Sequence, residues 1–120
     1  MAKILYVDDE ADIREVAQMA LELEPSLEVR GCASVAEALR VVPQWGPDLI
    51  LLDVMMPEMD GPTTLRALRE QGQGAPVVFI TARSQASEQQ ALIAAGALGV
   101  ISKPFDPMKL ADAVLQYLPG

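Results

Sequence analysis

Histidine is absent from this chain of 120 residues, and cysteine occurs once, at Cys32. Without an imidazole the chain lacks the general base of Ser-His-Asp hydrolases and a common zinc ligand. A single thiol cannot close a disulfide within the chain or build a thiolate metal cluster. Any chemistry must therefore use carboxylates, hydroxyls, lysine or arginine, and Cys32 is interpreted as a small buried hydrophobic residue.

Basic residues are also scarce, because nine Lys and Arg stand against 17 Asp and Glu, for a net charge of −8. A nucleic-acid surface needs clustered positive charge, so we expect no direct contact with nucleic acid. No apolar run approaches the ~20 residues of a membrane span, and the N-terminus lacks a signal-peptide pattern. By elimination, these absences favour a cytoplasmic protein without membrane contact.

Aromatic residues make up only 4% of the chain while hydrophobic residues make up 51%, so aliphatic side chains and methionine must fill the core. The length suits one domain, which we place at residues 1–120, and no linker, repeat or low-complexity segment divides it. We therefore expect no further output domain within this chain.

The central element is an unbroken apolar run from Leu49 to Leu52, followed by Asp53 and soon by Pro57. A run without alternation is typical of a parallel strand covered on both faces, and proline forbids further ladder pairing. Open α/β sheets bind their ligands at the carboxyl ends of such strands. Asp53 is therefore placed where a ligand site is expected.

Apolar runs alternate with amphipathic stretches along the whole chain. The expected strands are 3–7, 27–31 (at a sheet edge), 49–52, 76–80 and 98–101. The first helix precedes Pro25, the second runs from a Ser34–Glu37 capping box to Pro43, and the third opens at Pro62. The fourth, 87–95, has a weak apolar stripe, and the fifth opens at Asp106-Pro107. The inward faces of the first and last helices are Ile13, Val16, Ala17, Ala20 and Leu21, and Leu110, Ala111, Val114, Leu115 and Leu118.

This (βα)₅ alternation predicts an α/β fold in which helices cover both faces of a five-stranded parallel sheet. The flavodoxin-like strand order 2-1-3-4-5 is expected, with the binding crevice between strands one and three.

Chemically active side chains follow four of the strands: Asp8 and Asp9, Asp53, Thr81 and Lys103. Because parallel strands bring their carboxyl ends to one edge, three carboxylates would face one ammonium, leaving a formal charge of −2. Such crowding is unfavourable unless a cation neutralises it. Oxygen donors without His or Cys select Mg²⁺, or Mn²⁺, over zinc.

Four motifs carry a resemblance to a known family: residues 7–10 (VDDE), 52–61 (LDVMMPEMDG), 80–82 (ITA) and 102–105 (SKPF). Each motif stands at an expected strand end, and the four follow one another in the order found in that family. The chain resembles a response-regulator receiver domain of the CheY-like kind over essentially its whole length.

The resemblance implies that Asp53 accepts a phosphoryl group from a histidine kinase, a histidine phosphotransfer protein or a small phosphodonor. It also implies that Asp9 and Asp53 bind Mg²⁺ directly, with the backbone carbonyl of Met55, while Asp8 acts largely through water. A carboxylate that attacks an anionic phosphorus needs this neutralisation.

By the same resemblance, Lys103 and the Thr81 hydroxyl would hold phosphoryl oxygens, helped by the backbone amides of Val54 and Ala82. The Lys103-Pro104 peptide would be cis. The chain would then be a signalling phosphoacceptor rather than an enzyme, assisting its own phosphorylation and dephosphorylation and switching a surface read by a downstream protein or output domain.

One position departs from the family pattern, because Val100 stands where receivers commonly carry Tyr or Phe. We therefore expect signalling to run through the loop from Thr81 to Ser87 and the fourth helix. Met55 and Arg83, which flank the expected phosphate position, are predicted to set the access of water and hence the rate of dephosphorylation.

Three other functions would use similar residues. A haloacid-dehalogenase-type enzyme needs a second acid two residues after the nucleophile, where this chain has Met55. A flavodoxin-like cofactor binder needs a Gly-, Ser- or Thr-rich loop after the first strand, where this chain has acids. A pseudo-receiver that binds proteins without phosphorylation stays open as the alternative. So do dimerisation and the identities of kinase and target.

Overall fold

A computed structural model describes residues 1–54, 56, 60–72, 74–82 and 85–118. Strands and helices alternate throughout, as the apolar pattern predicted. The strands are β1 (Ala2–Val7), β2 (Leu27–Cys32), β3 (Leu49–Asp53), β4 (Val77–Thr81) and β5 (Gly99–Ser102). The helices are α1 (Ala11–Glu22), α2 (Val35–Trp45), α3 (Gly61–Glu70), α4 (Ala86–Ala94) and α5 (Pro107–Tyr117).

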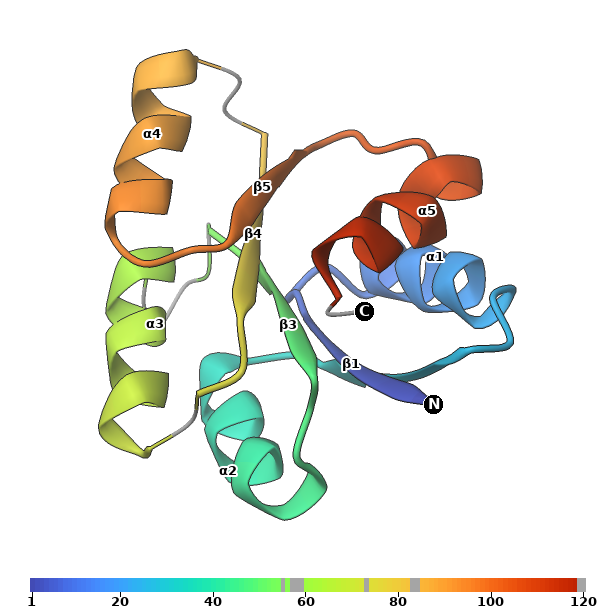
Figure 1. Cartoon of the computed structure of the whole chain (residues 1–120), viewed down its shortest axis with the longest axis horizontal. Coiled ribbons are helices and arrows are strands. Elements are labelled where there is room, and N and C mark those ends of the chain that lie inside the picture. Colours follow the sequence, from blue (N-terminus) through green and yellow to red (C-terminus); the bar gives the residue numbers. More distant parts are fainter. Residues whose placement is uncertain (55, 57–59, 73, 83–84, 119–120) are drawn as a thin grey trace.

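The five strands form one parallel sheet in the order β2-β1-β3-β4-β5, which confirms the expected topology. Figure 1 shows α1 and α5 together on one face of the sheet and α2, α3 and α4 on the other. The partly polar strand β2 lies at the edge, as predicted. Two helices on one side and three on the other complete the three-layer sandwich.

Alternation along the strands divides the core into two clusters. On the α1–α5 face lie Ile4, Tyr6, Leu49, Leu51, Val78 and Ile80 with helical partners including Ala17, Leu21, Leu110 and Val114. On the opposite face lie Leu5, Val7, Ile50, Leu52, Val77 and Phe79 with partners including Val35, Val42, Leu65 and Leu68. Every residue of β3 and β4 is buried, which explains their unbroken apolar runs.

The helical stripes are narrower than the sequence pattern indicated. Val16 of α1 is 44% exposed and Leu115 of α5 is 36% exposed, so the prediction that both face inward is wrong. Each lies at the margin of the buried stripe of its helix. In α4 only Leu92 is buried, in keeping with its weak apolar stripe.

The prediction that α2 ends at Pro43 is also wrong, because the helix continues to Trp45. Proline has no N–H for the carbonyl four residues earlier, that of Leu39. The side-chain amide of Gln71 donates to this carbonyl at 2.9 Å instead. A residue at the end of α3 thus replaces the missing donor. Gly46, which follows Trp45 with a left-handed φ of 67°, caps the end of α2.

Within the described residues, no helix is both long and apolar enough to cross a membrane.

Candidate functional site

Two buried carboxylates lie side by side at the carboxyl edge of the sheet. Val7 pairs with Leu52 in the β1–β3 register, so Asp8 and Asp53 follow on neighbouring strands at the same level. Strand alternation points both side chains to the α1–α5 face, because Tyr6 and Leu51 lie there two residues earlier. Both acids are almost completely buried. The register alone therefore brings together two of the three acids that the sequence predicted at this edge.

Lys103 reaches these acids from the far side of β4. Its backbone N–H donates to the Thr81 carbonyl at 2.7 Å, which extends the β4–β5 ladder by one residue. Its ammonium lies 3.1 Å from Oδ2 of Asp8 and 3.1 Å from Oδ2 of Asp53. The Lys103-Pro104 peptide is cis, as predicted. One cation therefore bridges the two buried carboxylates.

The Asp8 carboxylate is held by several donors. Its Oδ1 accepts a hydrogen bond from the Glu10 backbone N–H at 2.9 Å. Its Oδ2 accepts one from the Tyr6 hydroxyl at 3.3 Å, in addition to the Lys103 ammonium. The Asp8 carbonyl also accepts from Nη1 of Arg14 at 2.7 Å. Asp8 is therefore fixed by its surroundings, in contrast to the exposed Asp9.

The acids shift the protonation of their neighbours. Burial lowers the pKa of Lys103, but hydrogen bonds to Asp8 and Asp53 outweigh it and leave that pKa above its ordinary value. Burial, followed by the negative charge of Asp8, raises the pKa of the Tyr6 hydroxyl far above its usual range. Near neutral pH, Lys103 therefore stays a cation and Tyr6 stays a hydrogen-bond donor.

The carboxylates of Asp8, Glu10 and Asp53 offer one oxygen each within 4.8 Å of one another. Three negative charges against the Lys103 ammonium leave −2, and all the donors are hard oxygens. This set fits Mg²⁺ or Mn²⁺ and gives zinc none of its preferred nitrogen or sulfur ligands. Glu10, whose only signal in the sequence is its position next to the acid pair, was not among the predicted ligands, and the predicted ligand Asp9 is not one of the three residues in this group.

Thr81 lies on the other face of the sheet from Lys103. Alternation places it with Val77 and Phe79, and it lines a surface pocket of about 340 Å³ together with Asp60, Glu88 and Leu92 on the α3–α4 side. The structure therefore brings Thr81 to the same sheet edge as the acids but directs it toward a different layer.

Of the remaining predicted site residues, the structure describes Val54 and Ala82 but not Met55 and Arg83. The Val54 backbone N–H donates to the Ile80 carbonyl at 3.1 Å, so binding a phosphoryl oxygen would require it to leave or share that bond. Ala82 directly follows β4 at the sheet edge. Met55 and Arg83, and the predictions that rest on them, lie outside the described residues.

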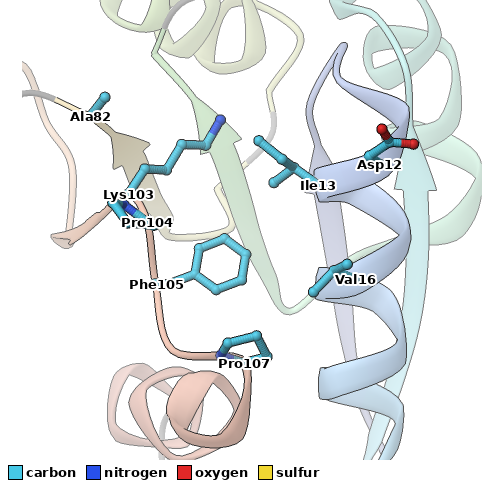
Figure 2. A pocket seen from close by; sticks show the side chains of 8 residues that line it. All are labelled: Asp12, Ile13, Val16, Ala82, Lys103, Pro104, Phe105 and Pro107. Atoms are coloured by element: carbon cyan, nitrogen blue, oxygen red, sulfur yellow. The ribbon is translucent and has the colours of Figure 1, made fainter.

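An apolar pocket of about 360 Å³ adjoins the acid site, and Figure 2 shows the residues that line it. Ile13 and Val16 of α1 face Phe105 and Pro107 across it, and Lys103 and Ala82 also line it. A protein that approached Asp53 from this side would meet an apolar surface next to the charged site.

Comparisons with known proteins agree with this geometry. The sequence profile of the response regulator receiver domain matches residues 4–115. The chain is 40% identical over 117 residues to the transcriptional regulatory protein YvrH of Bacillus subtilis, covering 98% of this chain and 49% of that protein. It is 42% identical over 120 residues to a protein-glutamate methylesterase/protein-glutamine glutaminase of Hahella chejuensis, covering 97% of this chain and 30% of that protein.

Among solved structures, chemotaxis response regulator CheY4 of Vibrio cholerae superposes with a TM-score of 0.89 at 34% identity, covering 98% of this chain and 99% of that one. The receiver domain of the Francisella response regulator 1452 gives 0.88 at 26%, covering 98% and 96%. The chain spans about half or less of the length of YvrH and the methylesterase. It belongs to the response regulator receiver domain family.

Proposed function

We propose that this receiver domain accepts a phosphoryl group on Asp53 in a Mg²⁺-dependent reaction and thereby switches a surface read by another protein. The observation that carries the proposal is the Lys103 ammonium, 3.1 Å from buried carboxylate oxygens of both Asp8 and Asp53. A purely structural ion pair would need one acid, whereas a second buried acid adds repulsion that a divalent cation removes.

In the proposed reaction, an oxygen of Asp53 forms a bond to the phosphorus of a phosphohistidine on a kinase or phosphotransfer protein. The bond between phosphorus and the imidazole nitrogen breaks, its electron pair stays on the partner's imidazole, and that imidazole takes up a proton from solvent to leave as the neutral group. Lys103 then shifts from the acids to a phosphoryl oxygen, which carries the new negative charge. Thr81 and the Ala82 backbone amide are proposed as further donors, and Val54 joins them if its bond to Ile80 is released.

The metal would be held by Asp53 and Asp9, with Asp8 acting through water and Met55 supplying a carbonyl. Glu10 lies close enough to Asp8 and Asp53 to join this set. When bound, Mg²⁺ or Mn²⁺ would neutralise the acids and the incoming phosphoryl oxygens. The apolar pocket beside Lys103 gives a protein phosphodonor a contact surface next to Asp53.

The output is proposed to be a change in protein contacts rather than catalysis on a separate substrate. Val100 packs with the cluster that contains Leu92 of α4, on the same face of the sheet as Thr81. A shift of Thr81 toward a phosphoryl group would therefore act on α4, which buries only Leu92. Three predictions accompany this proposal: a downstream protein or output domain that reads the surface, a second copy of the chain as a partner, and a cytoplasmic location.

Beryllofluoride, which mimics a phosphoryl group on aspartate, tests the proposal without a partner protein. With Mg²⁺ present, we expect it to shift the NMR signals of residues around Asp53 and of α4. Asp53→Asn, which keeps the shape of the side chain, should abolish the response. A parent protein that shows no response in Mg²⁺ and beryllofluoride would instead support the pseudo-receiver.

A further inference from the structure

The Tyr6 hydroxyl is a buried polar group that the proposed function leaves without a role. Tyr6 stands two residues before Asp8 on β1, and alternation places both side chains on the α1–α5 face. The tyrosine is fully buried, and its hydroxyl lies 3.3 Å from Oδ2 of Asp8. A phenylalanine would fill the same space, so the core alone gives no reason for a hydroxyl at this position.

Two different donors converge on the same oxygen of Asp8. Besides the Tyr6 hydroxyl, Oδ2 accepts the Lys103 ammonium at 3.1 Å. The tyrosine is fixed by a ring packed in the core, whereas Lys103 is a long flexible side chain shared with Asp53. The bond from Tyr6 is longer than the ~2.8 Å typical of hydroxyl donors. It therefore has room to shorten if the lysine leaves.

If Lys103 left Asp8, the buried Asp8 carboxylate would lose a donor, which is unfavourable in free energy. Asp8 is completely buried, and a buried carboxylate that loses a donor loses more free energy than the bond itself contributed. Its other oxygen is already occupied by the Glu10 N–H. Tyr6 is the second donor in place at Oδ2.

We propose that Tyr6 is a positioning residue whose hydroxyl keeps the Asp8 carboxylate in place when Lys103 turns from Asp8 to a phosphoryl oxygen on Asp53. The inference rests on the proposed function for the movement of Lys103. The hydrogen bond between Tyr6 and Asp8 is present before any movement of Lys103. Tyr6 would touch neither metal nor phosphoryl group and would act through Asp8 alone.

The test compares Tyr6→Phe with Tyr117→Phe, since these are the two tyrosines of the chain. Tyr117 packs on Gly99, the first residue of β5, and Tyr117→Phe removes the same hydroxyl oxygen away from the acid site. Calorimetric titration measures Mg²⁺ binding alone and beryllofluoride binding in the presence of Mg²⁺. We expect Tyr6→Phe to weaken beryllofluoride binding about three- to tenfold while changing Mg²⁺ binding less than about twofold, and Tyr117→Phe to change neither.

A second comparison removes the lysine in advance. In a Lys103→Met background, Asp8 already depends on Tyr6, so adding Tyr6→Phe should weaken Mg²⁺ binding about three- to tenfold without beryllofluoride. A general packing defect would instead weaken Mg²⁺ binding equally with and without Lys103, and that result would overturn the proposal. Equal beryllofluoride affinities of Tyr6→Phe and the parent would overturn it as well.

The parent protein offers a check that needs no substitution. With fluorotyrosine incorporated, the fluorine signal of Tyr6 should move when Mg²⁺ and beryllofluoride are added, while that of Tyr117 stays. A Tyr6 signal that stays with bound beryllofluoride would contradict the proposal. If the parent binds no beryllofluoride, the proposed function fails, yet Mg²⁺ binding in the Lys103→Met background still tests the contact between Tyr6 and Asp8.

Discussion

The Lys103 ammonium lies 3.1 Å from Oδ2 of Asp53, although the two residues are 50 positions apart in the chain. The sheet order makes this possible, because β3 and β5 flank β4 and end at the same edge. The same ammonium also contacts Asp8, so the lysine stands in for part of the positive charge that a metal ion would bring.

Replacing Lys103 by methionine should destabilise the protein when Mg²⁺ is absent. Asp8 and Asp53 would lose their shared cation while buried, and breaking a buried ion pair costs about 3 kcal/mol. Urea unfolding in EDTA measures the loss, and Mg²⁺ should restore most of it. Lys109→Met, an exposed lysine on α5, is the control. A Lys103→Met protein as stable in EDTA as the parent would show that the acids do not need this cation.

Magnesium should stabilise the folded chain through the acid site. A ligand that binds only the folded state adds about 2.7 kcal/mol at one hundred times its dissociation constant, and EDTA should remove this gain. Asp9→Asn should weaken Mg²⁺ binding more than Glu10→Gln, because Asp9 is proposed as a direct metal ligand, whereas the Glu10 carboxylate is paired with the Lys103 ammonium at 3.7 Å. The reverse order in calorimetry would make Glu10 a main ligand in place of Asp9.

Much of the fold was predictable because its signals are local. An apolar run marks a buried strand, a proline marks the start of a helix, and the acid after the central strand marks where that strand ends. Each of these signals lies within a few residues of the element that it predicts. The course of α2 was not predictable in this way. The helix continues past Pro43, and the carbonyl that proline leaves without its usual donor accepts a hydrogen bond from Gln71, 32 positions away from Leu39. No local pattern carries that information.

The site was predictable to the level of strand ends but not of side-chain direction. Asp8, Asp53 and Lys103 meet as expected, since the strand order and register decide it. Alternation within β4 could have shown that Thr81 faces the α3–α4 layer, as Phe79 does. The approach of the exposed Glu10 to the other acids depends on the path of a short loop, which composition and spacing do not report.

Gln71→Ala tests the explanation for the continuation of α2 past Pro43. The Leu39 carbonyl would lose its donor, which should lower the free energy of unfolding by about 1 kcal/mol. Gln44→Ala, at an exposed position of α2, should change it much less. If both substitutions have the same effect in urea unfolding, the hydrogen bond from Gln71 contributes nothing to stability.

Cys32 should make stability depend on pH in the alkaline range. Burial, assisted by the charge of Glu37, raises the pKa of its thiol to about 12, whereas an unfolded thiol titrates near 8.5. Above that lower value the unfolded state releases its proton first, so stability falls as the pH rises toward the folded pKa. Between neutral pH and about pH 10, the free energy of unfolding of the parent should fall by about 2 kcal/mol more than that of Cys32→Ala. Parallel pH profiles would contradict the buried neutral thiol.

The most direct measurement of the central claim is the intact mass of the protein after incubation with acetyl phosphate. When the incubation contains Mg²⁺, we predict one added phosphoryl group, mapped to Asp53; it should not form when EDTA replaces Mg²⁺ or when Asp53 is replaced by asparagine. A parent protein that gains no mass in Mg²⁺, or that gains it equally when Asp53 is replaced, would contradict the account.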